Sequence, residues 1–195
     1  MSGAALSARA QPVVLVFGDS LSAGYGLPQG RGWVDLLRQR LAAADQPLQV
    51  VNASISGETT LGGRNRLPAM LAQHRPRAVI LQLGANDALR GQSLDRMREN
   101  LQAMVKASRA ANAEVLLVGM RIPPNYGQEY TRKFQASFAE VARSQKIAIV
   151  PFLLEGFADQ REMFQSDGIH PTVQAQPLML DTVWAKLGPL LAKLR

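Results

Sequence analysis

The stretch VVLVFGDSLS, residues 13–22, decides the fold. Its first five residues are apolar and three of them are β-branched, which is typical of a strand buried on both faces. Gly18 would end that strand, so Ser20 follows its carboxyl end, where open α/β sheets bind ligands. Ser20 is therefore a candidate nucleophile. The alternative is that Ser20 caps a following helix, because serine is common at that position.

Segments of strand and helix character alternate along the rest of the chain. Further strands are predicted at 48–52, 78–83, 114–119 and 147–151. Helices are predicted at 33–41, 93–111, 129–145 and 175–194, and another helix is predicted to end at about residue 74. Such alternation predicts a parallel sheet with right-handed crossovers and helices on both faces. We therefore expect an α/β domain of three layers, α/β/α, whose five parallel strands take the flavodoxin-like order 2-1-3-4-5.

The composition limits the chemistry that is open to the chain. Its 195 residues can bury roughly 70% of the surface of the unfolded chain. It contains no cysteine, which excludes disulfides, thiolate metal sites and cysteine nucleophiles. With only two histidines, His74 and His170, a histidine-rich metal site is implausible. We expect neither a metal nor a cofactor.

The charge of the chain does not indicate a nucleic-acid partner. The 22 Lys and Arg residues give a net charge of +7, but they are spread from Arg9 to Arg195 without interleaved aromatic residues. The net positive charge indicates only a general attraction for anionic substrates or surfaces. No apolar run approaches the ~18 residues that a membrane-spanning helix needs.

The first residues form a segment of their own. Residues 1–11 are mostly small or apolar and include Ala8-Arg9-Ala10, which resembles a signal-peptide cleavage site. We interpret 1–11 as the remnant of an export signal, or otherwise as a disordered N-terminus, before a single domain at 12–195. The first interpretation predicts a periplasmic or secreted protein. The sequence says nothing about the oligomeric state.

Small and polar residues follow each of the first three strands. In the predicted order strand 1 lies between strands 2 and 3, so Ser20, Gly57 and Asn86 follow neighbouring strands, ~4.8 Å apart. Taken alone, Gly57 is a turn glycine and Asn86 an Asx-turn residue. Together, the backbone N–H groups of Ser20 and Gly57 and the side-chain amide of Asn86 predict an oxyanion hole with three donors.

A serine nucleophile needs a base, and histidine is the side chain suited to that role near neutral pH. His74 lies at a polar helix end between arginines, so we expect it at the surface. His170 precedes the last helix, and the chain before it is long enough to recross three strand spacings, roughly 14 Å, to Ser20. Asp167 and Gly168 allow a tight turn in which the carboxylate accepts the Nδ1 proton of His170.

These residues resemble a known family. The segments GDSLS (18–22), GAND (84–87) and DGIHP (167–171), with Gly57, resemble the four blocks of the SGNH hydrolases, also called the GDSL esterase/lipase family. The string VNASISGET (51–59) is similar to the bacterial periplasmic acyl-CoA thioesterase/lysophospholipase/arylesterase branch. The likeness runs from about Val13 to the C-terminus.

The resemblance implies a role for each matched residue. Ser20 is then the nucleophile, Gly57 and Asn86 are oxyanion donors, and Asp167 and His170 complete the triad. Ala85 stands where the family often has a second glycine. We expect its methyl group to shift the Asn86 loop and narrow the site.

We therefore expect a metal-independent serine hydrolase that cleaves carboxylic ester or thioester bonds through an acyl-enzyme. Its substrates would be small acyl compounds such as aryl esters, acyl-CoA and lysophospholipid, with transient contact with lipid. The alternative is a non-catalytic flavodoxin-like module that binds an anion at the loop after strand 1. Residues 88–92 and 121–130 are predicted to border the acyl-binding groove, with contacts from Leu89, Ile122, Pro123 and Tyr126.

Overall fold

The structure is a computed structural model that describes residues 11–44 and 48–194. Its sheet has five strands, β1 Val13–Gly18, β2 Gln49–Asn52, β3 Ala78–Gln82, β4 Glu114–Val118 and β5 Ala148–Val150. All neighbouring strands are parallel, in the order β2-β1-β3-β4-β5. The predicted fold class and strand order are confirmed. Except for Gln11, the predicted N-terminal segment 1–11 lies outside the described residues.

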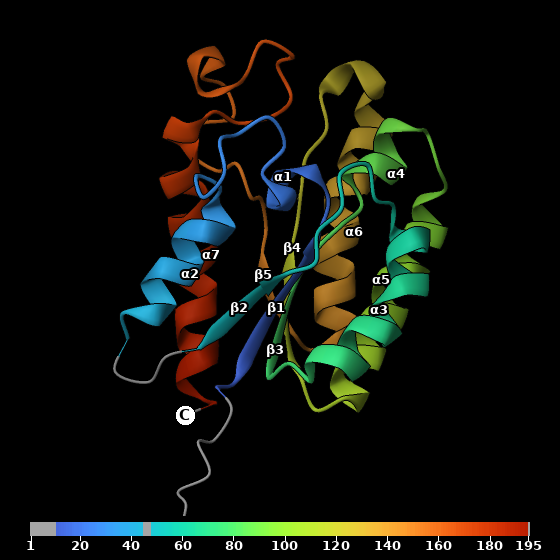
Figure 1. Cartoon of the computed structure of the whole chain (residues 1–195). Coiled ribbons are helices and arrows are strands. Elements are labelled where there is room, and N and C mark those ends of the chain that lie inside the picture. Colours follow the sequence, from blue (N-terminus) through green and yellow to red (C-terminus); the bar gives the residue numbers. More distant parts are fainter. Residues whose placement is uncertain (1–10, 45–47, 195) are drawn as a thin grey trace, which may run out of the picture.

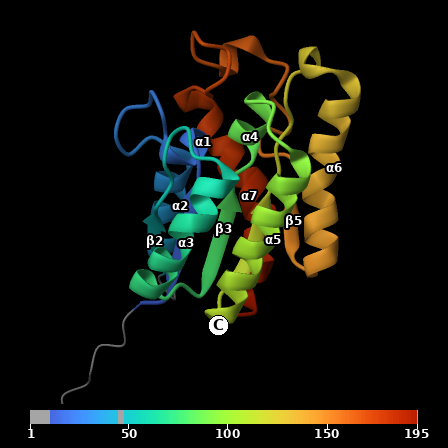
Figure 2. The ribbon, with the colours of Figure 1, turned by 90° about the vertical axis from the view of Figure 1, so that its right-hand side faces the viewer.

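The helices cover both faces of the sheet (Figures 1 and 2). On one face lie α2 Trp33–Ala42 and α7 Gln176–Ala192; on the other lie α3 Thr60–His74, α5 Leu94–Ala110 and α6 Gln128–Gln145. Two short helices, α1 Ser20–Ala23 and α4 Ala85–Leu89, occupy segments that the sequence pattern does not identify as helical. No helix in the described part of the chain is long and apolar enough to cross a membrane.

The core follows from the position of each strand in the sheet. The residues of β3 are all buried, as are those of β1 beyond Val13, because helices cover both faces of these inner strands. β2 and β5 lie at the two edges and are only partly buried. α2 packs on the sheet through an apolar face whose buried residues are Trp33, Val34, Leu37 and Leu41.

The carboxyl ends of the strands share one edge, at the top of Figure 1, and the loops gather there. The connection from β5 to α7 is long and contains two short 3₁₀ turns, Arg161–Met163 and Val173–Ala175. This connection brings the base beside the end of β1, since His170 contacts Ser20 across 150 positions of sequence. The fold thus assembles the predicted site from distant segments.

Candidate active site

Ser20 is the first residue of α1, directly after β1. The helix is capped by Asp19, whose Oδ1 accepts the N–H of Leu21 at 3.1 Å. The capping role considered for Ser20 therefore belongs to Asp19. The hydroxyl of Ser20 is left to point toward His170.

The side chains of Ser20, His170 and Asp167 form a continuous chain of hydrogen bonds. His170 Nε2 lies 2.9 Å from Ser20 Oγ, and His170 Nδ1 lies 2.7 Å from Asp167 Oδ2. A carboxylate only accepts, so Nδ1 carries the proton and Nε2 presents its lone pair to the serine hydroxyl. The imidazole is therefore oriented to accept the proton of Ser20.

Asp167 is held in its charged form. Partial burial raises the pKa of Asp167, but hydrogen bonds from His170 and from the N–H of Ile169 outweigh burial and lower this pKa to about 2. Oδ1 of Asp167 accepts the N–H of Ile169 at 2.9 Å and that of His170 at 3.0 Å, the usual length of such bonds. Asp167 thus supplies a fixed negative charge that stabilises a protonated imidazole.

The turn between Asp167 and His170 belongs to a small hairpin, residues 163–172, which we name the triad hairpin. Gln165 N–H donates to the carbonyl of His170 at 2.8 Å, and Thr172 N–H donates to that of Met163 at 2.8 Å. Gly168 has φ = 71°, a left-handed conformation that glycine adopts without strain. Glycine between Asp167 and His170 therefore allows the tight turn that the sequence predicted.

The predicted oxyanion donors lie at the ends of β1, β2 and β3. Asn86 is the second residue of α4, and its Nδ2 donates one proton to the carbonyl of Glu58 at 3.0 Å. Because the partner only accepts, the orientation of the amide is settled and its second N–H remains available. Within residues 11–44 and 48–194, no hydrogen bond uses the N–H of Ser20 or of Gly57.

The structure assigns different places to Gly84 and Ala85 in the loop before Asn86. The glycine that the loop requires is Gly84, with φ = 125°, where a Cβ would lie 3.1 Å from the sulfur of Met97 and 3.2 Å from the ring of Phe138. Ala85 begins α4, and its methyl group packs in the hydrophobic core. The shift of the Asn86 loop expected from this methyl stays a prediction.

A buried polar group lies beneath Ser20, and sequence reasoning missed it. Gln82 ends β3, and its Oε1 accepts the hydroxyl of Ser22 at 2.6 Å and the N–H of Asp19 at 3.4 Å. Burial raises the pKa of Asp19 to about 6, although the N–H of Leu21 and the side chain of Gln82 lower it. The signal was a glutamine at the end of an otherwise apolar strand.

A second buried network fixes α4, which carries Asn86. The carboxylate of Asp87 accepts both the N–H of Thr60, at 2.9 Å, and the hydroxyl of Thr60. Asn100 donates to the same hydroxyl at 3.1 Å. The network joins the first turn of α3 and the second turn of α5 to α4. Asp87 belongs to the GAND motif, but no role for it is predicted from the sequence.

The two segments predicted to border the acyl groove lie side by side. The hydroxyl of Tyr130 lies 3.0 Å from the carbonyl of Gln92 and 3.4 Å from that of Ala88. The four predicted groove residues differ in exposure: Leu89 is half-buried, Ile122 is 6% exposed, and Pro123 and Tyr126 are exposed. Ile122 thus offers little surface to a ligand in this structure, and the roles of all four residues stay predictions.

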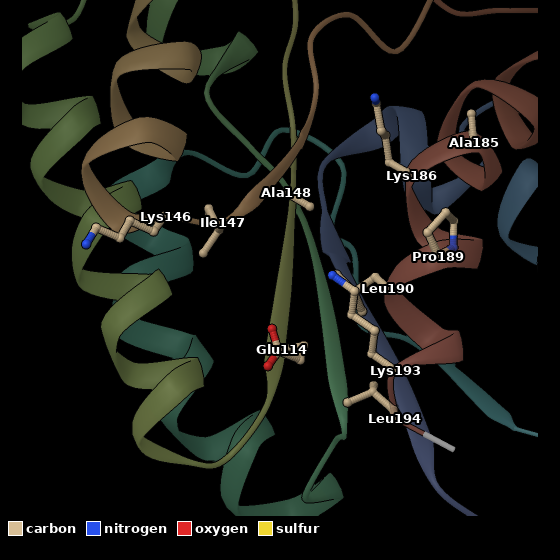
Figure 3. Close-up of a pocket in the computed structure, with 10 residues that line it drawn as sticks. All are labelled: Glu114, Lys146, Ile147, Ala148, Ala185, Lys186, Pro189, Leu190, Lys193 and Leu194. Carbon is tan, nitrogen blue, oxygen red and sulfur yellow. The ribbon is translucent and has the colours of Figure 1, made fainter.

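A separate groove of about 500 Å³ lies at the opposite end of the sheet (Figure 3). It lies where β4 and β5 begin and α7 ends, and its lining includes Lys146, Lys186 and Lys193 around an apolar floor. None of the predicted site residues lines this groove. In the part of the chain that the structure describes, no cluster of His, Asp or Glu is placed to hold a metal ion.

Known proteins resemble the chain over nearly its whole length. Residues 16–176 match the GDSL-like lipase/acylhydrolase family. The chain is 48% identical to the esterase TesA of Pseudomonas aeruginosa, over 93% of this chain and 90% of that protein. It is 40% identical to thioesterase 1/protease 1/lysophospholipase L1 of Escherichia coli K12, over 94% and 86%. The crystal structure of the psychrotrophic esterase EstA from Pseudoalteromonas sp. has a TM-score of 0.88 and 41% identity, covering 93% of this chain and 100% of that one.

Proposed function

Since the chain belongs to the GDSL-like lipase/acylhydrolase family and is a carboxylic ester hydrolase, we propose that Ser20, His170 and Asp167 are its catalytic triad. The observation that carries the proposal is the unbroken chain of hydrogen bonds, 2.9 Å from Ser20 Oγ to His170 Nε2 and 2.7 Å from His170 Nδ1 to Asp167 Oδ2. The hydrolases among its relatives disfavour the alternative of a non-catalytic anion-binding module.

In the first step Ser20 Oγ attacks the acyl carbon while its proton moves to His170 Nε2. The carbonyl oxygen becomes an oxyanion, and three donors are available to it: the N–H groups of Ser20 and Gly57 and the second N–H of Asn86 Nδ2. His170 then gives its proton to the leaving oxygen or sulfur, the bond to the leaving group breaks, and the acyl group stays on Ser20.

In the second step water releases the acid. His170 takes a proton from water, the hydroxide attacks the acyl-enzyme, and the proton returns to Ser20 Oγ as the acyl–oxygen bond breaks. Asp167 stays ionised throughout, because its pKa lies at about 2. The reaction uses only groups of the protein and water.

The substrate class that we propose is acyl esters and thioesters, including aryl esters, acyl-CoA and lysophospholipid. Two of the relatives are named an esterase and a thioesterase/lysophospholipase. The edge of the sheet that carries Ser20 also has exposed apolar side chains, among them Tyr25, Ile55 and Tyr126, which suit an acyl chain or transient contact with lipid. A panel of p-nitrophenyl esters, acyl-CoAs and lysophospholipids would rank these substrates.

The test of the triad is Ser20→Ala. We expect kcat to fall by about 10⁶-fold, as for other serine nucleophiles, and covalent labelling by a fluorophosphonate to disappear. Ser144→Ala is the matched control, because the Ser144 hydroxyl only bonds the carbonyl of Val141 within its own helix. A Ser20→Ala enzyme that retains more than a few per cent of activity would contradict the assignment of the nucleophile.

A further inference from the structure

We propose that Gln165 is a positioning residue that sets the contact between Ser20 and His170. It does so by holding the triad hairpin against the loop at residues 24–32, which we name the glycine loop. The inference rests on the proposed triad and adds to it a residue that contacts neither the substrate nor the reacting atoms.

The triad hairpin fixes Asp167 and His170 relative to each other but not relative to Ser20. The bonds of the Asp167 carboxylate to His170 and Ile169, and the bond from Gln165 N–H to the His170 carbonyl, all lie within residues 163–172. These bonds alone would let residues 163–170 move as a unit and keep the Asp–His pair, while Gln176 holds residues 171 and 172. A further contact is needed to hold Nε2 at 2.9 Å from the serine hydroxyl.

The side chain of Gln165 provides that contact. Its Nε2 donates to the carbonyl of Tyr25 at 2.9 Å and to that of Pro171 at 3.1 Å. Tyr25 N–H in turn donates to the carbonyl of Ser20 at 3.1 Å. Within the described residues, this bond and the Ser20–His170 contact itself are the hydrogen bonds that join residues 163–170 to residues 20–32. The other end of the hairpin is tied through Gln176, which donates to the carbonyl of Thr172 at 3.0 Å and accepts the N–H of Trp33 at 3.0 Å, beyond the glycine loop.

The glycine loop is shaped to receive this side chain. Gly26 has φ = 72°, and a Cβ there would lie 2.2 Å from Gln165 Oε1. The ring of Tyr25 packs on the ring of His170, with 4.5 Å between the centroids. The loop thus contacts Gln165 through its backbone and His170 through a side chain, so a displacement at Gln165 reaches the base.

The contact requires an amide at position 165. Both protons of Nε2 face carbonyl oxygens, so a carboxylate of the same shape would place an acceptor against two acceptors. Gln165→Glu is therefore a sharper test than Gln165→Ala, because it keeps the size of the side chain and reverses the interaction. Gln165→Met removes the donors at similar length without adding a charge.

The experiment compares Gln165→Glu and Gln165→Met with Gln160→Glu as the matched control. Gln160 is also half-buried, and its Nε2 donates to a backbone carbonyl, that of Gly156 at 3.0 Å. Its backbone carbonyl accepts the N–H of Met163, a bond that the substitution keeps, but within the described residues its side chain makes no hydrogen bond to the triad hairpin or the glycine loop. We measure kcat and KM on a p-nitrophenyl ester, the rate of fluorophosphonate labelling, and the low-field proton resonance of His170 Nδ1–H. Circular dichroism checks that each variant is folded.

For Gln165→Glu we expect kcat and the labelling rate to fall together by about 10²-fold, as for a misplacement of about 1 Å. KM should change little, and the Nδ1–H resonance should persist, because the Asp167–His170 pair lies within the hairpin. Gln165→Met should lose about 10-fold, and Gln160→Glu should stay within twofold of the original enzyme. If Gln165→Glu does not fold, the kcat and labelling rate of Gln165→Met test the proposal instead.

Two results would overturn the inference. Both Gln165 variants could retain kcat within twofold, or the Nδ1–H resonance could vanish together with activity, which would make Gln165 a support of the hairpin alone. Either result leaves the triad standing if Ser20→Ala is inactive. Failure of the Ser20→Ala test would instead remove the proposed function.

Discussion

Ser20 Oγ and His170 Nε2 lie 2.9 Å apart, but the surroundings of the two residues differ. Ser20 follows a strand buried between two helical layers, and buried Asp19, Ser22 and Gln82 lie beneath it. His170 stands on a hairpin whose residues 166–169 are exposed and whose shape depends on a few hydrogen bonds. Packing thus positions the nucleophile, whereas polar contacts at the surface position the base. Changes near Ser20 should therefore affect stability as well as rate, and changes in the hairpin should affect mainly rate.

The largest effect is expected for substitutions in the triad hairpin. His170→Ala should lower kcat by about 10⁶-fold, close to Ser20→Ala, and Asp167→Asn should be less severe, at most about 10⁴-fold. The double variant His170→Ala/Asp167→Asn should be no slower than His170→Ala, because an orienting carboxylate has no task once the base is absent. Steady-state kinetics measures the loss of rate. Thermal unfolding measures stability, and we expect little change in Tm. Additive losses in the double variant would place Asp167 outside the triad.

The next largest effect is expected at Asn86, where a substitution should lower both the catalytic rate and the stability. Asn86→Ala removes an oxyanion donor, so kcat should fall by about 10²–10³-fold with little change in KM. It also removes the 3.0 Å bond to the Glu58 carbonyl, so the free energy of unfolding should fall by about 1 kcal/mol. Kinetics and urea unfolding test the two parts separately. An effect confined to KM would make Asn86 a residue that binds substrate in the ground state.

The smallest effect concerns the pH dependence of stability beneath Ser20. The pKa of Asp19 is raised from 3.8 to about 6 in the folded protein, so the folded state binds a proton more tightly than the unfolded state. Its contribution to stability is therefore fully present below about pH 4 and lost as the pH rises to about 6. The free energy of unfolding should fall by about 1 kcal/mol per pH unit in that window.

The Asp19→Asn variant is the control for this pH dependence of the free energy of unfolding, because an amide does not titrate. Unfolding by urea at several pH values should show a shallower slope between pH 4 and 6 in the variant. Asp167 does not interfere, since its pKa is lowered to about 2 and its contribution is lost only as the pH falls below about 4. Equal slopes in the two proteins would show that Asp19 does not titrate in this window.

The sheet and the triad candidates were accessible from sequence because each rests on a local pattern or on elimination. Apolar runs mark the strands, and His170 stands out because the chain has only two histidines. The sequence did not reveal the polar supports. Gln82 contacts Ser22 across 60 positions and Gln165 contacts Tyr25 across 140, so no local pattern links either pair. The sequence also did not reveal that the glycine with positive φ in this loop is Gly84.

The position of the triad hairpin in the chain imposes an order on the making of this enzyme. Ser20, Gly57 and Asn86 lie in the first half of the sequence, and all five strands end by Val150. His170 follows Ser20 by 150 residues, so it leaves the ribosome after every strand has been synthesised. A nascent chain that has completed its sheet still lacks the base. The triad can therefore form only after residues 167–170 have been synthesised, whatever the state of the sheet.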